Sequence, residues 1–486
     1  MNRQQKIAAA VAATSAAALI AACGGGGSSA EAPALVTQSA FELQMEASRL
    51  NLGADPSMQH WRSFYCNLSD DNNAIVIAQR ARNSIRMPLT QILDDVWYIG
   101  TEYVGQYILK NSQGLVKIDA GNNADEMRNY NLPAMRTLGL GPGVPLNGVL
   151  VTHGHADHDG GAVELKTSTG APIYLGSADA AGKAYAPTTL DSSVMTPFDI
   201  SVGGRTITVL STPGHTVGAF GFIVRAQDDG KEVKLFVSGG SSLVAENVPL
   251  IQSYLNSMER TYDLLKKMKV DTASNPHTYW DGSRNLIQQI QAEGRKKPSQ
   301  FIIGNDRLLR AMAIGRTCTA AWLAKKDPTA VMPVWRVSSL DFMPASPSAA
   351  QLSARVTNGW GPVSSQTVSF TTAAGAALCT ARTDKDGVAT CQPTSALKVG
   401  TDRVIARFDG ASTVSTVDLG SESTALVEDP AVSGCRDLAA ARSASGSRQG
   451  DALYSPRLDI NADGVINLRD LEAITKALPA GTACKA

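Results

Sequence analysis

Residues 152–161 read Thr152-His153-Gly154-His155-Ala156-Asp157-His158-Asp159-Gly160-Gly161 and hold three of the six histidines of the 486-residue chain. Neutral imidazole and carboxylate are ligands that suit zinc, and a turn that crowds several of them needs a cation to offset their cost. Iron or manganese also occupy histidine-carboxylate sites, so the residue types favour zinc without excluding either metal. The stretch therefore predicts a metal site.

Two further histidines stand where they can join this cluster. The cluster follows a predicted buried strand at 149–151, and His215 follows a predicted strand at 207–210. His277 lies in a predicted loop after an amphipathic helix expected at 251–270. Ligands at the ends of successive strands are typical of sheet-based enzymes, which gather catalytic groups on loops. His60 has no such context, and we expect a structural role for it.

Length and charge limit the classes of protein. A chain of 486 residues exceeds what one core usually supports, so we expect two or three domains. Lys plus Arg and Asp plus Glu both number 44, and no basic surplus points to nucleic acid.

Changes of pattern along the chain set the expected boundaries. Residues 1–23 read as a secretory signal with an apolar run too short to span a bilayer, and 24–91 as a tether and N-terminal extension. Strands alternate with helices over 92–328, which predicts an α/β domain. Short strands rich in Val and Thr predict an all-β sandwich over 332–425. Residues 420–450 read as a linker, leading into a last module at 434–486.

Seven cysteines divide into one near the signal and six in the exported body, where disulfides persist. Six cysteines allow 15 pairings. Locality favours Cys379 with Cys391 and Cys435 with Cys484, which leaves Cys66 for Cys318.

Residues 459–470 have the spacing of an EF-hand calcium loop, with oxygen ligands at positions one, three, five, nine and twelve and glycine at six. Asp470 stands where the bidentate glutamate is usual. The alternative is a solvated turn rich in Asn and Asp. The expected ligands of one Ca²⁺ are Asp459, Asn461, Asp463, Val465, Asn467 and Asp470.

The histidine cluster, with His215 and His277, resembles the metallo-β-lactamase superfamily from about Val96 to His277. The resemblance implies an αββα sandwich in which His153, His155 and His215 bind one zinc ion. It implies that Asp157, His158 and His277 bind a second, and that Asp157 also orients the attacking hydroxide. Asp119, in Ile118-Asp119-Ala120-Gly121, would orient a ligand from outside the two metal sites.

One departure separates this chain from most hydrolases of that superfamily, which bridge the two metals with an Asp after the strand expected at 233–237. Here that stretch is Ser238-Gly239-Gly240-Ser241-Ser242, without a carboxylate or thiol. The β-lactamase subclass with His-His-His and Asp-His-His sites also lacks this residue, and this chain is similar to it. Ser241 or Ser242 would contact substrate or form only a turn.

The resemblance implies an exported dizinc hydrolase that uses a metal-bound hydroxide to open an amide-type, β-lactam-like ring of a small molecule. Hydrolysis of a lactone, ester or thioester is the alternative within enzymes. An alternative of another class is a non-catalytic cell-surface binding protein on a degenerate scaffold.

The other segments carry resemblances of their own. Ile20-Ala21-Ala22-Cys23 resembles a bacterial lipobox, which implies a lipid on Cys23 and a place at the outer membrane or cell surface, with the anchor as the only membrane contact. Residues 332–425 resemble immunoglobulin-like domains. The calcium loop resembles a single dockerin repeat, so the C-terminal modules would serve a surface partner.

Overall fold

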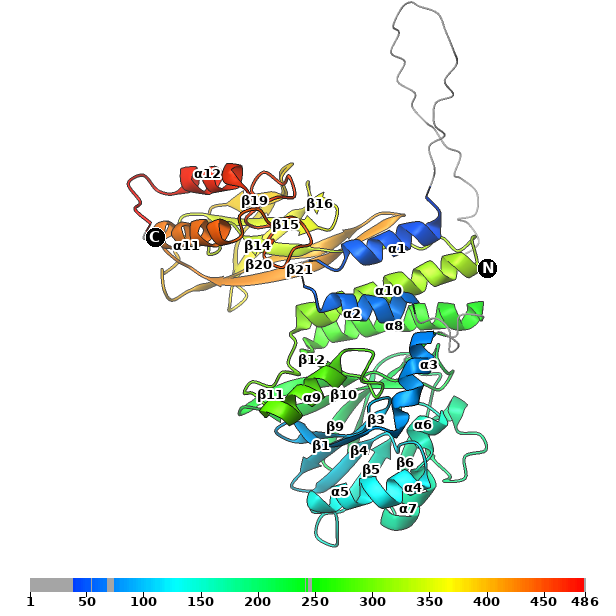
Figure 1. The fold of residues 1–486 in the computed structure, drawn as a ribbon. Coiled ribbons are helices and arrows are strands. Elements are labelled where there is room, and N and C mark those ends of the chain that lie inside the picture. Colours follow the sequence, from blue (N-terminus) through cyan, green and yellow to red (C-terminus); the bar gives the residue numbers. More distant parts are fainter. Residues whose placement is uncertain (1–37, 54, 68–73, 241, 244–246, 485–486) are drawn as a thin grey trace, which may run out of the picture. The chain divides into compact units, whose positions relative to one another are not determined.

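The computed structural model describes residues 38–53, 55–67, 74–240, 242–243 and 247–484 (Figure 1). The expected signal peptide, Cys23 and Ser241 lie outside the described residues. Among the described helices, none has both the length and the apolarity needed to cross a membrane.

Three helices precede the first sheet. They are α1 (Ala40–Leu50), α2 (Met58–Asn67) and α3 (Ala74–Arg80), and a 3₁₀ turn, Ala81–Ser84, follows them. Helix α1 starts with a capping box, because the Ser39 hydroxyl accepts from the Glu42 amide while the Glu42 carboxylate accepts from the Ser39 amide. The described part of the extension therefore begins with a capped helix.

Two sheets form the body of the α/β domain. The first has seven strands in the order β1-β2-β3-β4-β5-β6-β7, antiparallel from β1 to β4 and parallel from β4 to β7. The second has the order β12-β11-β10-β9-β8, and only its β11–β12 pair is parallel. The strands are β1 (Arg86–Leu93), β2 (Val96–Thr101), β3 (Gly105–Asn111), β4 (Gly114–Ile118), β5 (Leu146–Leu150), β6 (Ile173–Gly176), β7 (Thr188–Leu190), β8 (Phe198–Val202), β9 (Arg205–Ser211), β10 (Phe220–Asp228), β11 (Lys231–Val237) and β12 (Thr272–Ser274).

The two sheets share one apolar core, to which Tyr98 and Val116 contribute from the first sheet and Val209 and Phe222 from the second. Helices cover both outer faces (Figure 1). Sheets with both faces covered consist largely of buried residues, as β3 and β4 do. These layers confirm the expected metallo-β-lactamase-type α/β fold. The helices are α4 (Ala124–Glu126), a π-helical turn Met127–Asn131, α5 (Leu132–Thr137), α6 (Ala156–Asp159), α7 (Ala162–Thr169), a 3₁₀ turn Ser177–Asp179, α8 (Val248–Met268), α9 (Ser283–Glu293) and α10 (Asn305–Lys326).

Two smaller sheets follow and share a separate apolar core. One has the order β13-β21-β20-β17-β18, and in the other β14, β15 and β16 are joined by β19, which pairs with β15. A β-rich region was expected here, and its immunoglobulin-like identity stays a prediction. The strands are β13 (Val334–Val337), β14 (Ser339–Phe342), β15 (Leu352–Asn358), β16 (Gly361–Pro362), β17 (Thr367–Thr372), β18 (Ala377–Arg382), β19 (Val388–Cys391), β20 (Arg403–Ser412) and β21 (Thr416–Leu426).

The linker expected at 420–450 was wrong. Strand β21 continues to Leu426, and helix α11 (Pro430–Ser443) follows almost at once. Asp429 caps this helix by accepting from the Ala431 amide, and Pro430 suits its first turn. An Asp-Pro pair is a helix start signal that outweighs the polar composition of the segment. A second helix, α12 (Leu468–Ala477), follows the loop 459–467.

The expected disulfides are all confirmed. Cys66 pairs with Cys318, Cys379 with Cys391, and Cys435 with Cys484. The first joins α2 to α10, so it fastens the N-terminal extension to the α/β domain.

Candidate metal centre

The six expected ligands lie in segments that follow the ends of three strands. His153, His155, Asp157 and His158 follow β5, with α6 starting at Ala156. His215 follows β9 of the second sheet, and His277 follows β12. The structure brings the ligand atoms of all six together in two groups of three.

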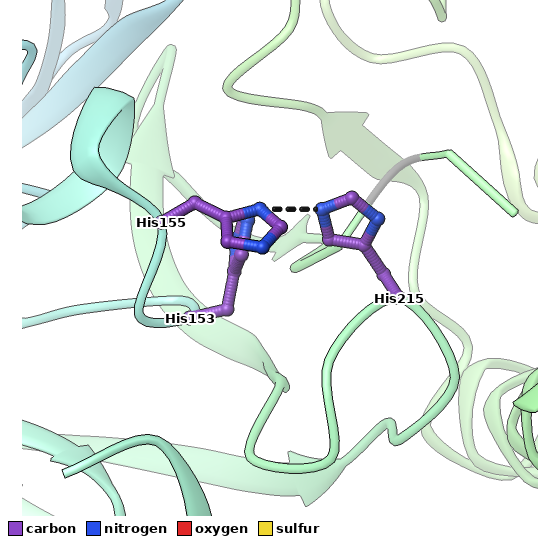
Figure 2. Close-up of side chains that lie close together, drawn as sticks. All are labelled: His153, His155 and His215. Atoms are coloured by element: carbon purple, nitrogen blue, oxygen red, sulfur yellow. Dashed lines mark hydrogen bonds between the residues drawn. The ribbon is translucent and has the colours of Figure 1, made fainter. Parts of the chain in front are cut away.

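The first group consists of His153, His155 and His215, whose ligand atoms lie within 4.8 Å of one another. Nδ1 of His155 lies 3.0 Å from Nε2 of His215 (Figure 2). The ring of His153 lies 4.8 Å from that of His155 and 4.7 Å from that of His215, between centroids. Three imidazoles from two loops thus converge on one point.

The second group consists of Asp157, His158 and His277. Nε2 of His158 lies 3.1 Å from Nε2 of His277, and Oδ2 of Asp157 lies 3.5 Å from Nε2 of His277. The groups adjoin, since the rings of His153 and His158 are 4.1 Å apart.

Hydrogen bonds on the outer side of four of the five rings, all but that of His155, fix which nitrogen faces inward. Nδ1 of His215 lies 2.7 Å from the Ser242 carbonyl, and Nδ1 of His277 lies 3.2 Å from the Tyr103 carbonyl. Carbonyl oxygens only accept, so both Nδ1 atoms carry the proton and both Nε2 atoms present a lone pair inward.

The same holds for the other two buried imidazoles. Nδ1 of His158 donates to Oδ2 of Asp119 at 2.7 Å. The Thr152 hydroxyl donates to the same carboxylate at 3.1 Å, so it accepts from Nδ1 of His153 at 3.1 Å. Nε2 of His153 is buried without any hydrogen-bond partner among the described residues. A buried nitrogen lone pair that has no donor and faces other lone pairs is expected where a metal cation binds.

The protonation states of the buried ligands also suit metal binding. Burial and neighbouring imidazoles lower the pKa of His153 well below its ordinary value and that of His215 to about 3. Burial lowers the pKa of His277 to about 4, although Asp157 opposes it. Burial alone would raise the pKa of Asp157, but His158 and His277 lower it to about 2. His153, His215 and His277 are therefore neutral at neutral pH, and Asp157 is ionised. Burial opposes charge on His158, but Asp157 and Asp119 raise its pKa above the ordinary value.

Asp119 organises the second group from outside it. It has φ 62°, uncommon for a residue with a Cβ, and its carboxylate also accepts from the Thr152 amide at 2.7 Å. Its own carbonyl accepts from Nζ of Lys117 at 2.9 Å. Lys117 is fully buried, and burial lowers its pKa to about 7. Lys117 was not predicted as part of the site, because its only signal is a charge within a strand of buried residues.

Packing excludes a side chain at the two glycines that follow β11. A Cβ on Gly239 would lie 2.0 Å from the Phe220 carbonyl oxygen, and one on Gly240 would lie 2.7 Å from Cβ of His215. Neither position admits a side chain without movement of its neighbours.

Ser242 contacts His215, through its carbonyl and, at 3.3 Å, through its hydroxyl. His60 stands outside both groups, with Nε2 2.6 Å from the Tyr279 carbonyl.

The αββα sandwich and the two ligand groups define the class of this domain, a metal-dependent hydrolase fold. Residues 103–230 match the family model of the metallo-beta-lactamase superfamily. The matched residues include five of the six ligands and end before His277.

Curated relatives cover the same region. A hydroxyacylglutathione hydrolase from Marinomonas sp. (strain MWYL1) is 34% identical over 112 residues, which are 22% of this chain and 36% of that protein. Another from Hyphomonas neptunium (strain ATCC 15444) is 29% identical over 144 residues, which are 30% of this chain and 53% of that protein. The chain thus spans about a third to a half of these relatives.

Two solved structures are similar to about half of this chain. A metallo-β-lactamase from Cronobacter sakazakii is 25% identical with a TM-score of 0.41, covering 51% of this chain and 98% of that one. The metallo-β-lactamase SMB-1 is 20% identical with a TM-score of 0.40, and the match covers 50% of this chain and 99% of SMB-1. At these TM-scores the assignment of the domain rests on the sequence match and the site geometry.

Proposed function

We propose that this protein is a dizinc hydrolase that opens an amide-type, β-lactam-like ring. The carrying observation is the convergence of six ligands into a three-histidine group and an Asp-His-His group with lone pairs directed inward. Imidazole and carboxylate are the donors that zinc prefers, so the residues fit the metal. Zinc ions bound there would polarise the attacked carbonyl and lower the pKa of water to near 7.

The side chains of the protein then have three tasks. His153, His155 and His215 hold one ion, and His158 and His277 with Asp157 hold the other. Asp157 stays ionised at neutral pH and can accept a hydrogen bond from the attacking water, which orients it. Asp119 keeps Nδ1 of His158 protonated, and thereby directs Nε2 inward.

Two observations favour different substrates. The glycines after β11, which leave no bridging carboxylate, favour the cyclic amide, because the resembling β-lactamase subclass shares this feature. Relatives named hydroxyacylglutathione hydrolase favour the alternative, hydrolysis of a lactone, ester or thioester.

Assays of the purified protein with added zinc separate these candidates. We expect turnover of nitrocefin, and loss of at least about 100-fold in kcat/KM for Asp157→Asn. Asp199→Asn is the matched control, because Asp199 contacts the Thr208 hydroxyl away from both groups. Turnover of an acyl-lactone or S-lactoylglutathione without nitrocefin turnover would favour the alternative. Protein that refuses zinc and turns over nothing would favour the non-catalytic scaffold.

We also propose that loop 459–470 binds one Ca²⁺. Asp459 and Asp470 are buried, and their carboxylates accept from backbone amides of the same loop, such as those of Gly464 and Ile460. Gly464 has φ +82°, as the sharp turn at position six requires. Calcium should raise the Tm of the protein more than magnesium does, and Asp463→Ala should abolish this rise. Asp451→Ala, a carboxylate outside the loop, should retain it.

Export with a lipid on Cys23, at the outer membrane or cell surface, remains part of the proposal and rests on the lipobox-like residues 20–23. Three disulfides suit an oxidising compartment. The C-terminal modules would then face a surface partner. Labelling with radioactive palmitate should mark wild-type protein and leave Cys23→Ala unmarked. Equal labelling of both would contradict the anchor.

A further inference from the structure

Asp179 makes three hydrogen bonds to the two loops that carry His155 and His215. It is the last residue of the 3₁₀ turn Ser177–Asp179, which follows β6. Its Oδ2 accepts from the Gly154 amide at 2.8 Å and from the Thr216 hydroxyl at 2.7 Å. Its Oδ1 accepts from the Gly218 amide at 3.0 Å. One carboxylate thus joins a loop of the first sheet to a loop of the second.

The two glycines that donate to Asp179 are required by its position. A Cβ on Gly154 would lie 2.9 Å from Cβ of Asp179, and one on Gly218 would lie 2.6 Å from its Cγ. Neither glycine has a positive φ, so space around the carboxylate, and not the backbone angle, excludes a side chain. Both loops are therefore shaped to bring their amides against Asp179.

This contact matters most for His155. The ring of His153 is anchored by Thr152 and that of His215 by Ser242. The ring of His155 is exposed, and within the described residues its nitrogens have one close polar neighbour, Nε2 of His215 at 3.0 Å. Its position therefore depends on its backbone.

Hydrogen bonds hold both the amide and the carbonyl of Gly154, the residue before His155. Asp179 accepts from the amide of Gly154, and Nζ of Lys183 donates to its carbonyl at 2.5 Å. Lys183 also forms an ion pair with Asp159 at 2.6 Å. The segment 179–183 thus clamps the turn between His153 and His155.

We propose that Asp179 is the positioning residue of the three-histidine group. It holds the loops of His155 and His215 at the separation that lets both rings bind one metal ion, and this role rests on the metal centre proposed above. Asp119 acts on the second group through His158, so each group has its own supporting carboxylate. Charge-assisted hydrogen bonds to backbone amides are short and directional, which suits this task.

The test compares zinc binding by Asp179→Asn with that of wild type, using a chromophoric chelator as competitor. The amide keeps the size of the side chain but has one acceptor oxygen in place of two, so its NH2 group faces at least one of the three donors and that hydrogen bond is lost, together with the negative charge that strengthens the others. We expect a 10- to 100-fold loss of affinity for one zinc ion, the range seen for outer-shell partners of metal ligands. The visible spectrum of the Co²⁺-loaded protein should change as well, because the geometry around one ion changes.

Asp191→Asn is the matched control. Asp191 lies on the same stretch of chain, and its carboxylate accepts only from the amide and hydroxyl of Ser193 among the described residues. The Asp191→Asn variant should bind two zinc ions with wild-type affinity. Thr216→Val removes one of the three bonds without changing any charge, and should give a smaller loss than Asp179→Asn.

Each outcome decides between the claims. Far-ultraviolet circular dichroism of the metal-free variants establishes folding, and Thr216→Val carries the test if Asp179→Asn does not fold. If folded Asp179→Asn binds both zinc ions with wild-type affinity, the role of Asp179 is overturned and the metal centre stays intact. The same result in Thr216→Val has this meaning where Asp179→Asn does not fold. Wild-type protein that takes up no zinc would contradict the metal centre itself, and the role of Asp179 with it.

Discussion

The Asp119 carboxylate accepts a hydrogen bond from Nδ1 of His158 at 2.7 Å, and both side chains are almost completely buried. Asp119→Asn should therefore weaken zinc binding at the Asp157-His158-His277 group by about 10- to 100-fold, because an amide holds this imidazole less strongly. Zinc titration against a chelator measures the loss. An unchanged second binding constant would show that His158 needs no such support.

Gly240 is expected to tolerate no side chain. It has φ +71°, and a Cβ there would meet Cβ of His215 at 2.7 Å. Gly240→Ala should displace His215 and weaken zinc binding at the three-histidine group by at least about tenfold, which corresponds to roughly 1.4 kcal/mol.

Gly230→Ala isolates the effect of the backbone angle. Gly230 has φ +73°, and no atom lies within 4 Å of a Cβ added there. Gly230→Ala therefore has the same backbone strain as Gly240→Ala but no steric contact with a neighbour. It should lose about 1–2 kcal/mol of unfolding free energy and keep its affinity for zinc. Equal zinc affinities in the two variants would contradict the steric argument.

Burial of Lys117 predicts a pH dependence of stability. Its pKa is about 7 in the folded protein and near 10.5 when unfolded, so the unfolded chain binds more protons between these values. Stability contributed by this site therefore rises with pH, by about 2 kcal/mol from pH 7 to pH 9. Lys117→Met should remove this rise, as urea unfolding of the metal-free protein at both pH values measures. Parallel pH profiles for the two proteins would show that Lys117 is not desolvated.

The Cys66–Cys318 disulfide should stabilise the N-terminal extension on the α/β domain. Its cysteines are 252 residues apart, against 12 for Cys379 and Cys391. Because a longer closed loop constrains the unfolded chain more, the double Ala variant of the first pair should lose about 2–4 kcal/mol and that of the second pair less. Urea unfolding with the other disulfides intact compares them. A larger loss for the short loop would contradict this explanation.

The parts of the site that could be predicted have local signals. His153, His155, Asp157 and His158 share one turn, and the strand before them is a clear apolar run. His215 also follows a predicted strand, and catalytic groups gather on loops at strand ends, so its convergence with the cluster could be expected. His277 was predicted only to lie in a loop after an amphipathic helix. The disulfides followed from locality, because two pairs lie within short modules.

Asp179 and Lys117 had no such signal. The partners of Asp179 lie 25 to 39 residues away in sequence, and a single Asp in an Ala- and Gly-rich segment has no spacing that marks it. Lys117 is a single charged residue in the apolar strand Gly114–Ile118, and one charge in a strand is usually a solvent-facing residue. It is buried because helices cover the outer face of this sheet, which no local pattern reveals.

Anomalous scattering at the zinc edge, from crystals of the zinc-loaded protein, tests the metal centre most directly. Two peaks are expected, one about 2.0–2.1 Å from nitrogens of His153, His155 and His215, and the other equally close to Asp157, His158 and His277. Absence of both peaks, or peaks bound by other residues, would contradict the account.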